Sequence, residues 1–251
     1  MVKILINGAL GRMGRKVAEA VNSFENASVL CGVDVVEKDL DFKVYSSYDK
    51  IPEKPSVIID FSSPACTPAL LDYAVKNNIP AVLCSTGYND NDIKLINEAS
   101  KSIAIFRSAN MSLGVNAIIS LVKNAAKILY GFDVEIIEKH HNQKVDAPSG
   151  TALMLADAIK EVQTDKFYTY GRVGKVGKRD ANEIGIHAIR GGNIVGEHDV
   201  LFAGENETIT ISHTATDRSV FAFGAVKAAL YIANKAPGLY DMNGLIEESQ
   251  K

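Results

Sequence analysis

Groups that can carry protons and positive charge are concentrated in one short segment near the middle of the chain. Two of the five histidines, His140 and His141, and two lysines lie within the six residues that end at Lys144. Histidine titrates near neutral pH and can donate or accept a proton, while lysine adds positive charge. The helix expected to begin near Ser149 offers backbone N–H groups that can hold a carboxylate. The segment therefore favours a site where an anionic substrate undergoes proton transfer.

Two other interpretations of this segment remain open. A metal site needs three or four ligands, yet adjacent histidines on a strand point to opposite faces. The other histidines, His187, His198 and His213, could complete such a site only through the tertiary fold. We expect no bound metal. The second alternative is a solvated polar turn that takes part in no reaction. A nucleophilic role for Ser149 is disfavoured, because the sequence places no base beside it.

A second chemical motif lies near the N-terminus. Three glycines, Gly8, Gly11 and Gly14, follow a short apolar run and precede a segment with helical periodicity. In a strand–turn–helix of this kind the first glycine permits a tight turn and the second lets the backbone approach a pyrophosphate. The third lets the helix pack closely on the sheet. The spacing G-x-x-G-x-x-G differs from the commoner G-x-G-x-x-G, so turn formation and packing alone remain an alternative.

Asp34 strengthens the interpretation of the glycine motif as a dinucleotide site. It ends the next apolar run, 26 residues after Gly8, where a carboxylate can accept hydrogen bonds from the adenosine ribose. An acid there also repels a 2′-phosphate, and Val35 follows it with no adjacent arginine. Three basic residues could substitute for that arginine: Arg12, Arg15 and Lys38. We therefore expect NADH to bind at least as well as NADPH.

The elements that must position these groups alternate between strand and helix patterns up to Asn110. Short apolar runs predict buried strands at Val2–Asn7, Val29–Val33, Ser56–Asp60, Ile79–Leu83 and Ile103–Phe106. Helical spacing of apolar residues predicts helices at Arg15–Asn22, Ala65–Lys76 and Asp90–Ala99. Repeated β-α-β units of this kind are typical of an α/β fold with a doubly wound parallel sheet.

The pattern changes after Asn110. Helices are predicted at Leu113–Tyr130, Thr151–Val162 and Ser219–Asn234, and strands at Asp133–Glu138, Ile184–Arg190, Ile194–Ala203 and Thr208–Thr214. Three strands in succession without intervening helices indicate a mixed or antiparallel sheet, and so a second domain of α+β type. The glycine-rich basic stretch from Gly171 to Arg179 is interpreted as a solvated loop, with a phosphate or nucleic-acid contact as the alternative.

Length and composition exclude several classes of protein. The chain has 251 residues, of which 47% are hydrophobic and 23% charged, as in an ordinary globular protein. The formal net charge of −3 gives no drive toward nucleic acid or an acidic membrane. No apolar stretch approaches the roughly 20 residues that a membrane span requires. Three scattered cysteines and the lack of a signal-peptide cleavage site indicate a cytoplasmic protein.

Several motifs together resemble the dihydrodipicolinate reductase family, also called 4-hydroxy-tetrahydrodipicolinate reductase, over nearly the whole chain. The most specific is Glu138-Lys139-His140-His141 followed by Lys144-Val145-Asp146-Ala147-Pro148-Ser149-Gly150-Thr151. The others are Gly8 to Arg15, Asp60-Phe61-Ser62, Ser85-Thr86-Gly87, Ser108 to Asn116, Arg190-Gly191-Gly192 and Val195 to His198.

The resemblance implies a fold and an assembly. A Rossmann-type dinucleotide-binding domain, residues 1–111 plus 217–251, would be interrupted by a domain of residues 112–216 built on a mixed sheet. The inserted domain would bind substrate and form a homotetramer through its sheets. NADH or NADPH is the implied cofactor and a small cyclic dicarboxylate the implied substrate. Neither nucleic acid nor a membrane is expected as a partner.

The same resemblance assigns roles to residues by position. His140 would be the catalytic acid/base and Lys144 the proton donor, while His141, Gly150 and Thr151 would bind substrate. The implied cofactor-binding residues are Gly8, Ala9, Leu10, Gly11, Arg12, Met13, Asp34, Cys84, Ser85, Thr86, Ser108, Ala109, Asn110 and Met111. Two positions depart from the family pattern, since Cys84 stands where many members have glycine and Val35 where some have arginine.

The implied reaction is hydride transfer from a reduced nicotinamide to a conjugated cyclic imine, followed by protonation, in diaminopimelate and L-lysine biosynthesis. One alternative is another nicotinamide-dependent enzyme of similar layout, such as an amino-acid dehydrogenase. The other is a non-catalytic sensor that binds the dinucleotide. A sensor would need the glycine motif and Asp34, but it would have no need for His140 and Lys144.

Overall fold

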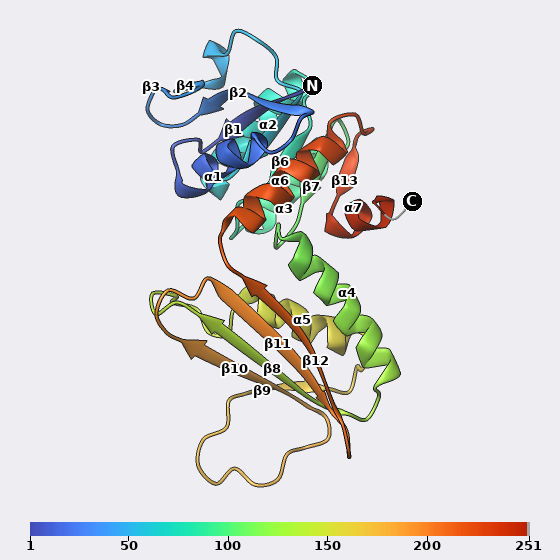
Figure 1. The fold of residues 1–251 in the computed structure, drawn as a ribbon. Helices are drawn as coiled ribbons and strands as arrows, with labels where there is room; N and C mark the ends of the chain where they lie inside the picture. Colours follow the sequence, from blue (N-terminus) through green and yellow to red (C-terminus); the bar gives the residue numbers. More distant parts are fainter. Residues whose placement is uncertain (250–251) are drawn as a thin grey trace. The chain divides into compact units, whose positions relative to one another are not determined.

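The computed structural model describes residues 1–249, which form two compact units. The first comprises Met1–Leu113 together with the chain from Arg218 onward, and the second comprises Gly114–Asp217. These boundaries differ by at most two residues from the domain boundaries expected from the sequence. Each unit has its own sheet and its own hydrophobic core (Figure 1).

The first unit is built on an eight-stranded sheet in the order β13-β7-β6-β5-β1-β2-β4-β3. Its strands are β1 (Val2–Asn7), β2 (Ala27–Val33), β3 (Lys38–Asp39), β4 (Lys43–Tyr45), β5 (Val57–Asp60), β6 (Ala81–Leu83), β7 (Ala104–Arg107) and β13 (Gly238–Tyr240). All neighbouring pairs are parallel except β3–β4. The strand order reverses at β1, and in such sheets ligands bind outside the carboxyl ends of the strands at that point.

Helices cover both faces of this sheet (Figure 1). They are α1 (Arg12–Val21) and α6 (Ser219–Ile232) on one face and α2 (Thr67–Lys76) and α3 (Asp90–Ala99) on the other, with one-turn 3₁₀ helices at Tyr48–Lys50 and Pro64–Cys66. Side chains alternate along β1, so Ile4 and Ile6 pack in the core under α1 and α6 while Leu5 packs in the opposite core. The middle of the central strand β1 is therefore apolar on both faces, and the predicted doubly wound fold is confirmed.

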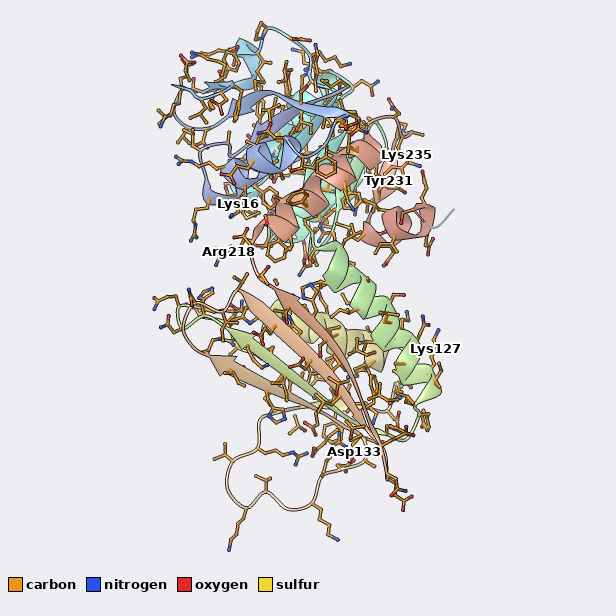
Figure 2. The ribbon with its side chains drawn as sticks, viewed as in Figure 1. Lys16, Lys127, Asp133, Arg218, Tyr231 and Lys235 are labelled. Carbon is orange, nitrogen blue, oxygen red and sulfur yellow. The ribbon has the colours of Figure 1, made fainter. Side chains whose placement is uncertain are left out.

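The C-terminal segment packs in the first unit. Gly224 of α6 lies directly on the backbone at Met111, where a Cβ would come within 1.7 Å of the carbonyl oxygen. Lys235 lies over the ring of Tyr231, with 4.7 Å between its Nζ and the ring centroid (Figure 2). The same ammonium pairs with Glu248 of α7 (Met242–Glu248), which ties the last helix to the end of α6.

The second unit is built on a five-stranded mixed sheet in the order β12-β11-β8-β10-β9. Its elements are α4 (Leu113–Ile128), β8 (Asp133–His140), α5 (Gly150–Lys160), β9 (Phe167–Tyr170), β10 (Glu183–Arg190), β11 (Gly196–Ala203) and β12 (Thr208–Ala215). Strands β8, β9 and β10 are parallel, whereas β11 is antiparallel to both β8 and β12. Both helices pack on one face, against a core that includes Ile136 and Val200 (Figure 1). The predicted mixed sheet is confirmed.

Differences from the predicted elements are local. Helix α1 begins at Arg12, three residues earlier than predicted, because Gly14 is accommodated within its first turn. The short elements β3, β4, β9, β13 and α7 are not predicted, since two to seven residues carry too little periodicity. All other predicted ends agree within two residues. One of these matters for the site: β8 continues to His140 because its ladder with β10 extends to the pair His140–Arg190.

Candidate active site

The turn after β1 forms a cradle that only glycine fits. Gly8 has a φ of +78°, and its N–H donates to the carbonyl oxygen of Val33 at 2.9 Å. The Gly11 N–H donates back to the carbonyl oxygen of Gly8 at 3.1 Å and closes the turn. A Cβ on Gly14 would lie 2.2 Å from the same oxygen and 2.8 Å from the Cα of Ala9. Backbone thus packs on backbone here, which brings the start of α1 close to the end of β1.

The N-terminus of α1 suits the phosphates of a dinucleotide. Gly11 is its N-cap residue and supplies no side-chain hydrogen bond, so the first-turn N–H groups have no side-chain cap. These groups, together with the positive end of the helix dipole, favour an anion. Cβ atoms on Gly8 and Gly14 would collide with backbone, at 2.9 Å from the carbonyl oxygen of Phe61 and 2.2 Å from that of Gly8, so only glycines let the turn and the helix N-terminus meet this closely. On this observation the residues present fit a pyrophosphate.

Asp34, the first residue after β2, is bonded to this turn. Its Oδ2 accepts the N–H of Leu10 and its Oδ1 accepts the N–H of Val35, both at 2.8 Å. The carboxylate therefore holds the middle of the glycine turn in place. Each oxygen keeps a further lone pair with which it can accept a ribose hydroxyl.

A buried polar network lies at the carboxyl ends of β1, β5 and β6. Asp60 is fully buried, and its carboxylate accepts hydrogen bonds from Asn7 Nδ2 at 2.7 Å, from Ser85 Oγ at 2.9 Å and from the Ser62 hydroxyl. Tyr48 donates its hydroxyl to Asn7 Oδ1 at 2.9 Å. The network fixes the loops that follow these three strands, and those after β1 and β6 carry predicted cofactor residues.

The structure places all the predicted cofactor-binding residues along one edge of the first sheet. Cys84, Ser85 and Thr86 follow β6, and the segment from Ser108 to Met111 follows β7. Strands β5, β6 and β7 are parallel to β1, so these loops leave the sheet on the side of the glycine turn. The Ser108 hydroxyl donates to the carbonyl oxygen of Asn110 at 2.8 Å, which shapes the last of them.

The second unit holds His140 against a buried carboxylate. Nδ1 of His140 lies 2.6 Å from Oε2 of Glu138, two residues earlier on the same face of β8. Glu138 is fully buried and also accepts two hydrogen bonds from Arg190, at 2.7 and 2.8 Å, and the N–H of Ser149 at 3.0 Å. Burial raises the pKa of Glu138, but the hydrogen bonds from Arg190, His140 and Ser149 outweigh it and hold that pKa below its usual value.

A second histidine packs beside the first. The His198 ring on β11 meets the His140 ring edge-on, with 5.3 Å between the centroids, and its Nε2 lies 3.0 Å from the Ser149 hydroxyl. Burial, reinforced by the neighbouring His140, lowers the pKa of His198 from 6.5 to about 4. His198 is therefore neutral at physiological pH and supports the N-terminus of α5 through Ser149.

Lys144 lies in the turn between β8 and α5. Its ammonium contacts both carboxylate oxygens of Asp146, at 2.7 and 2.8 Å, and this ion pair lowers the pKa of Asp146. Arg190 donates to the carbonyl oxygen of Asp146 at 2.6 Å. The guanidinium thus links the lysine turn to the carboxylate that contacts His140.

The first turn of α5 completes the cationic cluster of the second unit. Ser149 caps the helix, because its hydroxyl accepts the N–H of Ala152 at 3.2 Å. Gly150 is exposed, and a Cβ there would meet no atom within 4 Å, so the helix N-terminus is open to an anion. The structure therefore gathers His140, Lys144 and Gly150, with their neighbours His141 and Thr151, around the end of β8 and the start of α5.

Glu138 and Arg190 are functional candidates to which sequence reasoning gives no role. Both occur in motifs that carry the family resemblance, and His198 is considered only as a metal ligand. A usable signal was present, because Glu138 and His140 are two residues apart on a strand and must share a face. Arg190 has no comparable signal, since only the pairing of β10 with β8 brings it to Glu138.

The stability of the fold should depend on pH through His198. The unfolded chain takes up a proton near pH 6.5, whereas the folded His198 takes it up only near pH 4. The unfolded state binds more protons between these values, so the free energy of unfolding should fall by up to about 3 kcal/mol as the pH drops from 6.5 to 4. Denaturant titrations across this range should show a weaker dependence of the unfolding free energy on pH for His198→Gln than for the wild type. An equal pH dependence in wild type and His198→Gln would contradict this.

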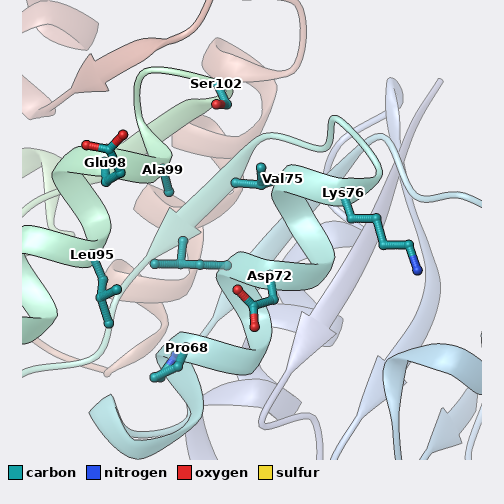
Figure 3. Close-up of a pocket in the computed structure, with 9 residues that line it drawn as sticks. Pro68, Asp72, Val75, Lys76, Leu95, Glu98, Ala99 and Ser102 are labelled. Carbon is teal, nitrogen blue, oxygen red and sulfur yellow. The ribbon is translucent and has the colours of Figure 1, made fainter.

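A pocket of about 490 Å³ lies between α2 and α3, lined by residues such as Leu71, Leu95 and Ser102 (Figure 3). No predicted site residue is among its lining residues. Within residues 1–249 there is no cluster of three or more histidine, cysteine or acidic side chains that could hold a metal ion. In the same range, no helix is long and apolar enough to cross a membrane.

The first unit is doubly wound and holds a glycine turn suited to a pyrophosphate. The second unit holds a lysine and a histidine that contacts a buried carboxylate. These are the parts of a dinucleotide-dependent oxidoreductase. Comparison with known protein families makes the class specific. Residues 2–111 match the family described as "Dihydrodipicolinate reductase, N-terminus", and residues 114–246 match "Dihydrodipicolinate reductase, C-terminus". The chain belongs to the dihydrodipicolinate reductase family, and the resemblance stated from the sequence is confirmed.

Individual relatives agree with this assignment. The chain is 53% identical over 249 residues to the 4-hydroxy-tetrahydrodipicolinate reductase of Caldanaerobacter subterraneus, covering 99% of both chains. It is 47% identical over 250 residues to the enzyme of that name from Clostridium novyi, covering 98% of this chain and 99% of the relative. A solved structure, the dipicolinate-bound dihydrodipicolinate reductase from Paenisporosarcina sp. TG-14, shares the fold with a TM-score of 0.81 at 24% identity, over 97% of this chain and 99% of that one.

Proposed function

We propose that this protein reduces 4-hydroxy-tetrahydrodipicolinate to tetrahydrodipicolinate with NADH or NADPH, in diaminopimelate and L-lysine biosynthesis. The observation that carries the proposal is the 53% identity, over essentially the full length of both chains, to a 4-hydroxy-tetrahydrodipicolinate reductase. The two units support it, since the first carries a pyrophosphate cradle and the second a cationic, proton-active turn. The relative from Paenisporosarcina binds dipicolinate, a cyclic dicarboxylate that this turn would suit.

The first unit would bind the dinucleotide. The turn from Gly8 to Met13 and the start of α1 would hold the pyrophosphate, and Asp34 the adenosine ribose. The loops after β6 (Cys84 to Thr86) and β7 (Ser108 to Met111) would line the nicotinamide half. The bound dinucleotide supplies a hydride to the substrate ring.

The second unit would orient the substrate and provide the proton. Loss of the 4-hydroxyl as water turns the substrate into a conjugated imine. Hydride addition to this imine leaves an enamine, and a proton on carbon completes the product. His140 would act as acid/base through Nε2, because its Nδ1 is engaged by Glu138. Lys144 would donate the proton and balance the negative charge of a dicarboxylate. His141 and the N–H groups of Gly150 and Thr151 would hold the carboxylates.

The proposal includes an assembly and a location. The sheet face opposite α4 and α5 carries partly exposed side chains such as Glu135, Ile137 and Lys139, which would pair with copies of the same chain in a homotetramer. Sedimentation or light scattering should then give four times the 27.1 kDa of one chain. We also propose that the enzyme works in the cytoplasm, where cell fractionation should recover its activity.

An assay with enzymatically generated substrate tests the proposed reaction directly. Oxidation of NADH or NADPH is measured as the loss of absorbance at the band of the reduced nicotinamide. It should require both the protein and the substrate. NADH oxidation that proceeds equally well with a 2-keto acid and ammonia in place of the cyclic dicarboxylate would favour an amino-acid dehydrogenase. Binding of the dinucleotide without any turnover would favour a sensor.

The cofactor preference should depend on Asp34. The wild-type protein should bind NADH at least as tightly as NADPH, because this carboxylate repels a 2′-phosphate and Val35 adds no charge to hold one. Asp34→Ala should shift the ratio of the two dissociation constants toward NADPH by about tenfold, or about 1.4 kcal/mol. Titration by fluorescence or calorimetry measures both constants, with Asp39→Ala as a control that makes the same charge change at an exposed ion pair. A tenfold preference of the wild type for NADPH would instead point to Arg12, Arg15 or Lys38.

A further inference from the structure

The carboxylate of Glu138 is fully occupied by donors. Oε1 accepts Nη2 of Arg190 at 2.7 Å and the N–H of Ser149 at 3.0 Å. Oε2 accepts Nη1 of Arg190 at 2.8 Å and lies 2.6 Å from Nδ1 of His140. Two oxygens thus take four hydrogen bonds in a fully buried site, two on each. Three of the four partners, the two Arg190 nitrogens and the Ser149 N–H, can only donate to the carboxylate. The remaining question is whether Nδ1 of His140, the fourth partner, donates or accepts.

His140 donates through Nδ1. The donors from Arg190 and Ser149 cannot reverse, because a guanidinium and a backbone N–H have no lone pair to offer. The same donors keep the pKa of Glu138 low, so the carboxylate is ionised and accepts on both oxygens. The proton of a neutral His140 must then lie on Nδ1, and its Nε2 presents a lone pair.

The surroundings of Nε2 agree with a working role for that nitrogen. Gly196 on β11 lies across from His140, and a Cβ there would come within 3.1 Å of Nε2. Glycine therefore leaves room beside this atom, while the His198 ring packs edge-on against the imidazole and limits its rotation. Nothing else in the described contacts of His140 engages Nε2.

We propose that Glu138, clamped by Arg190 and by the N–H of Ser149, is the positioning residue that fixes the His140 tautomer and leaves Nε2 to exchange the proton with substrate. The proposal rests on the proposed function for its catalytic consequence, but the tautomer itself is a property of the protein alone. Arg190 balances the charge of Glu138, so the pair orients the ring without placing a net charge beside it. A positioning residue of this kind acts through the histidine and need not touch substrate.

Glu138→Gln is the sharpest test, because the clamp dictates how glutamine must lie. The amide oxygen is needed at the Oε1 position, where Nη2 of Arg190 and the N–H of Ser149 both donate. The amide NH₂ then takes the Oε2 position, where it faces Nδ1 of His140 and Nη1 of Arg190 loses its acceptor. Nδ1 must then accept, and the imidazole proton moves to Nε2. The variant keeps size and shape yet presents the wrong tautomer, as known for an acid-to-amide change in a serine-protease triad.

The tautomer is read from ¹⁵N-resolved imidazole spectra at a pH of about 8.5, where an ordinary histidine is neutral. The wild type should carry the His140 proton on Nδ1, and Glu138→Gln on Nε2. We expect kcat to fall by about 10²-fold or more, with KM and NADH affinity within about threefold of wild type. Glu138→Asp retains a carboxylate and should keep the proton on Nδ1 and recover at least tenfold in kcat over Glu138→Gln.

Glu135→Gln is a matched control. Glu135 on β8 contacts His187 on β10 and Arg179 in the loop before β10, as Glu138 contacts His140 and Arg190, but at 2.8 Å from the other imidazole nitrogen, Nε2. This variant should leave the His140 spectrum unchanged. It also separates a general loss of sheet stability from a specific effect on the His140 tautomer.

The outcomes distinguish this proposal from the proposed function. A wild-type His140 with its proton on Nε2, or an unchanged tautomer in Glu138→Gln, overturns the positioning role whatever the activity. Should the proton move while kcat stays at the wild-type value, the positioning of His140 stands and its role as acid/base is wrong. The wild-type spectrum decides the tautomer even if Glu138→Gln fails to fold.

Discussion

Replacing His140 by alanine is expected to lower kcat by about 10²–10⁴-fold, the usual effect of losing a positioned acid or base. NADH affinity should stay within a few-fold of wild type, because the glycine turn that would bind the dinucleotide belongs to the other compact unit. His187→Ala is the matched control, since it removes a second histidine that pairs with an acid, the partly exposed Glu135, on the same sheet. Steady-state kinetics combined with direct NADH titration measure both quantities.

Lys144→Ala should give a similar loss of kcat with a further rise in KM. Its ammonium would balance a dicarboxylate in the ground state as well as donate a proton, so both parameters depend on it. Lys139→Ala removes a neighbouring lysine whose ion pairs, with Glu197 and Asp199, are separate from the Asp146 contact of Lys144, and it should leave kcat near the wild-type value. Wild-type turnover in the His140 variant would remove the assigned acid/base, and a parallel loss of NADH binding would indicate misfolding.

Local sequence patterns predict those elements of the fold whose conformation depends on neighbouring residues in the chain. Strand β1 is buried on both faces, and a run of apolar residues such as Ile4, Leu5 and Ile6 suits only such a position. The glycine turn is equally local. Gly8 has a positive φ, Gly14 has no room for a Cβ, and both requirements arise within a few residues of the chain. The start of α5 follows in the same way from the polar stretch before it, whereas β8 runs two residues past its predicted end because of its ladder with β10.

Long-range contacts decide what the sequence does not predict. Strand β13 is three residues long and exists because it pairs with β7, far earlier in the chain. Arg190 lies far from Glu138 in sequence, and only the β8–β10 ladder brings its guanidinium to the buried carboxylate. The Asp60 network likewise joins loops after three separate strands. An isolated polar residue shows no periodic pattern in the sequence, so its hydrogen-bond partners can be identified only from the tertiary fold.

Gly14→Ala should damage both stability and cofactor binding. The new Cβ would lie 2.2 Å from the carbonyl oxygen of Gly8 and within 3 Å of the Cα and carbonyl carbon of Ala9. All three atoms belong to the backbone and cannot rotate away as a side chain could. We expect a loss of about 3 kcal/mol in the free energy of unfolding, at the upper end of the usual cost of overpacking. Chemical denaturation followed by circular dichroism measures it.

The same substitution should weaken NADH binding by at least about tenfold, or about 1.4 kcal/mol. To relieve the clash, α1 must move away from β1, and its N-terminal N–H groups then no longer converge with the glycine turn on one pyrophosphate. Gly238→Ala is the control in the same unit, because its Cβ would make an ordinary contact of 3.4 Å with the Tyr240 ring. If Gly14→Ala kept wild-type stability and NADH affinity, the close approach of helix and turn would not be what builds the pyrophosphate site. A stable variant that has lost only NADH binding would show that the fold tolerates the displaced helix and that the phosphates do not.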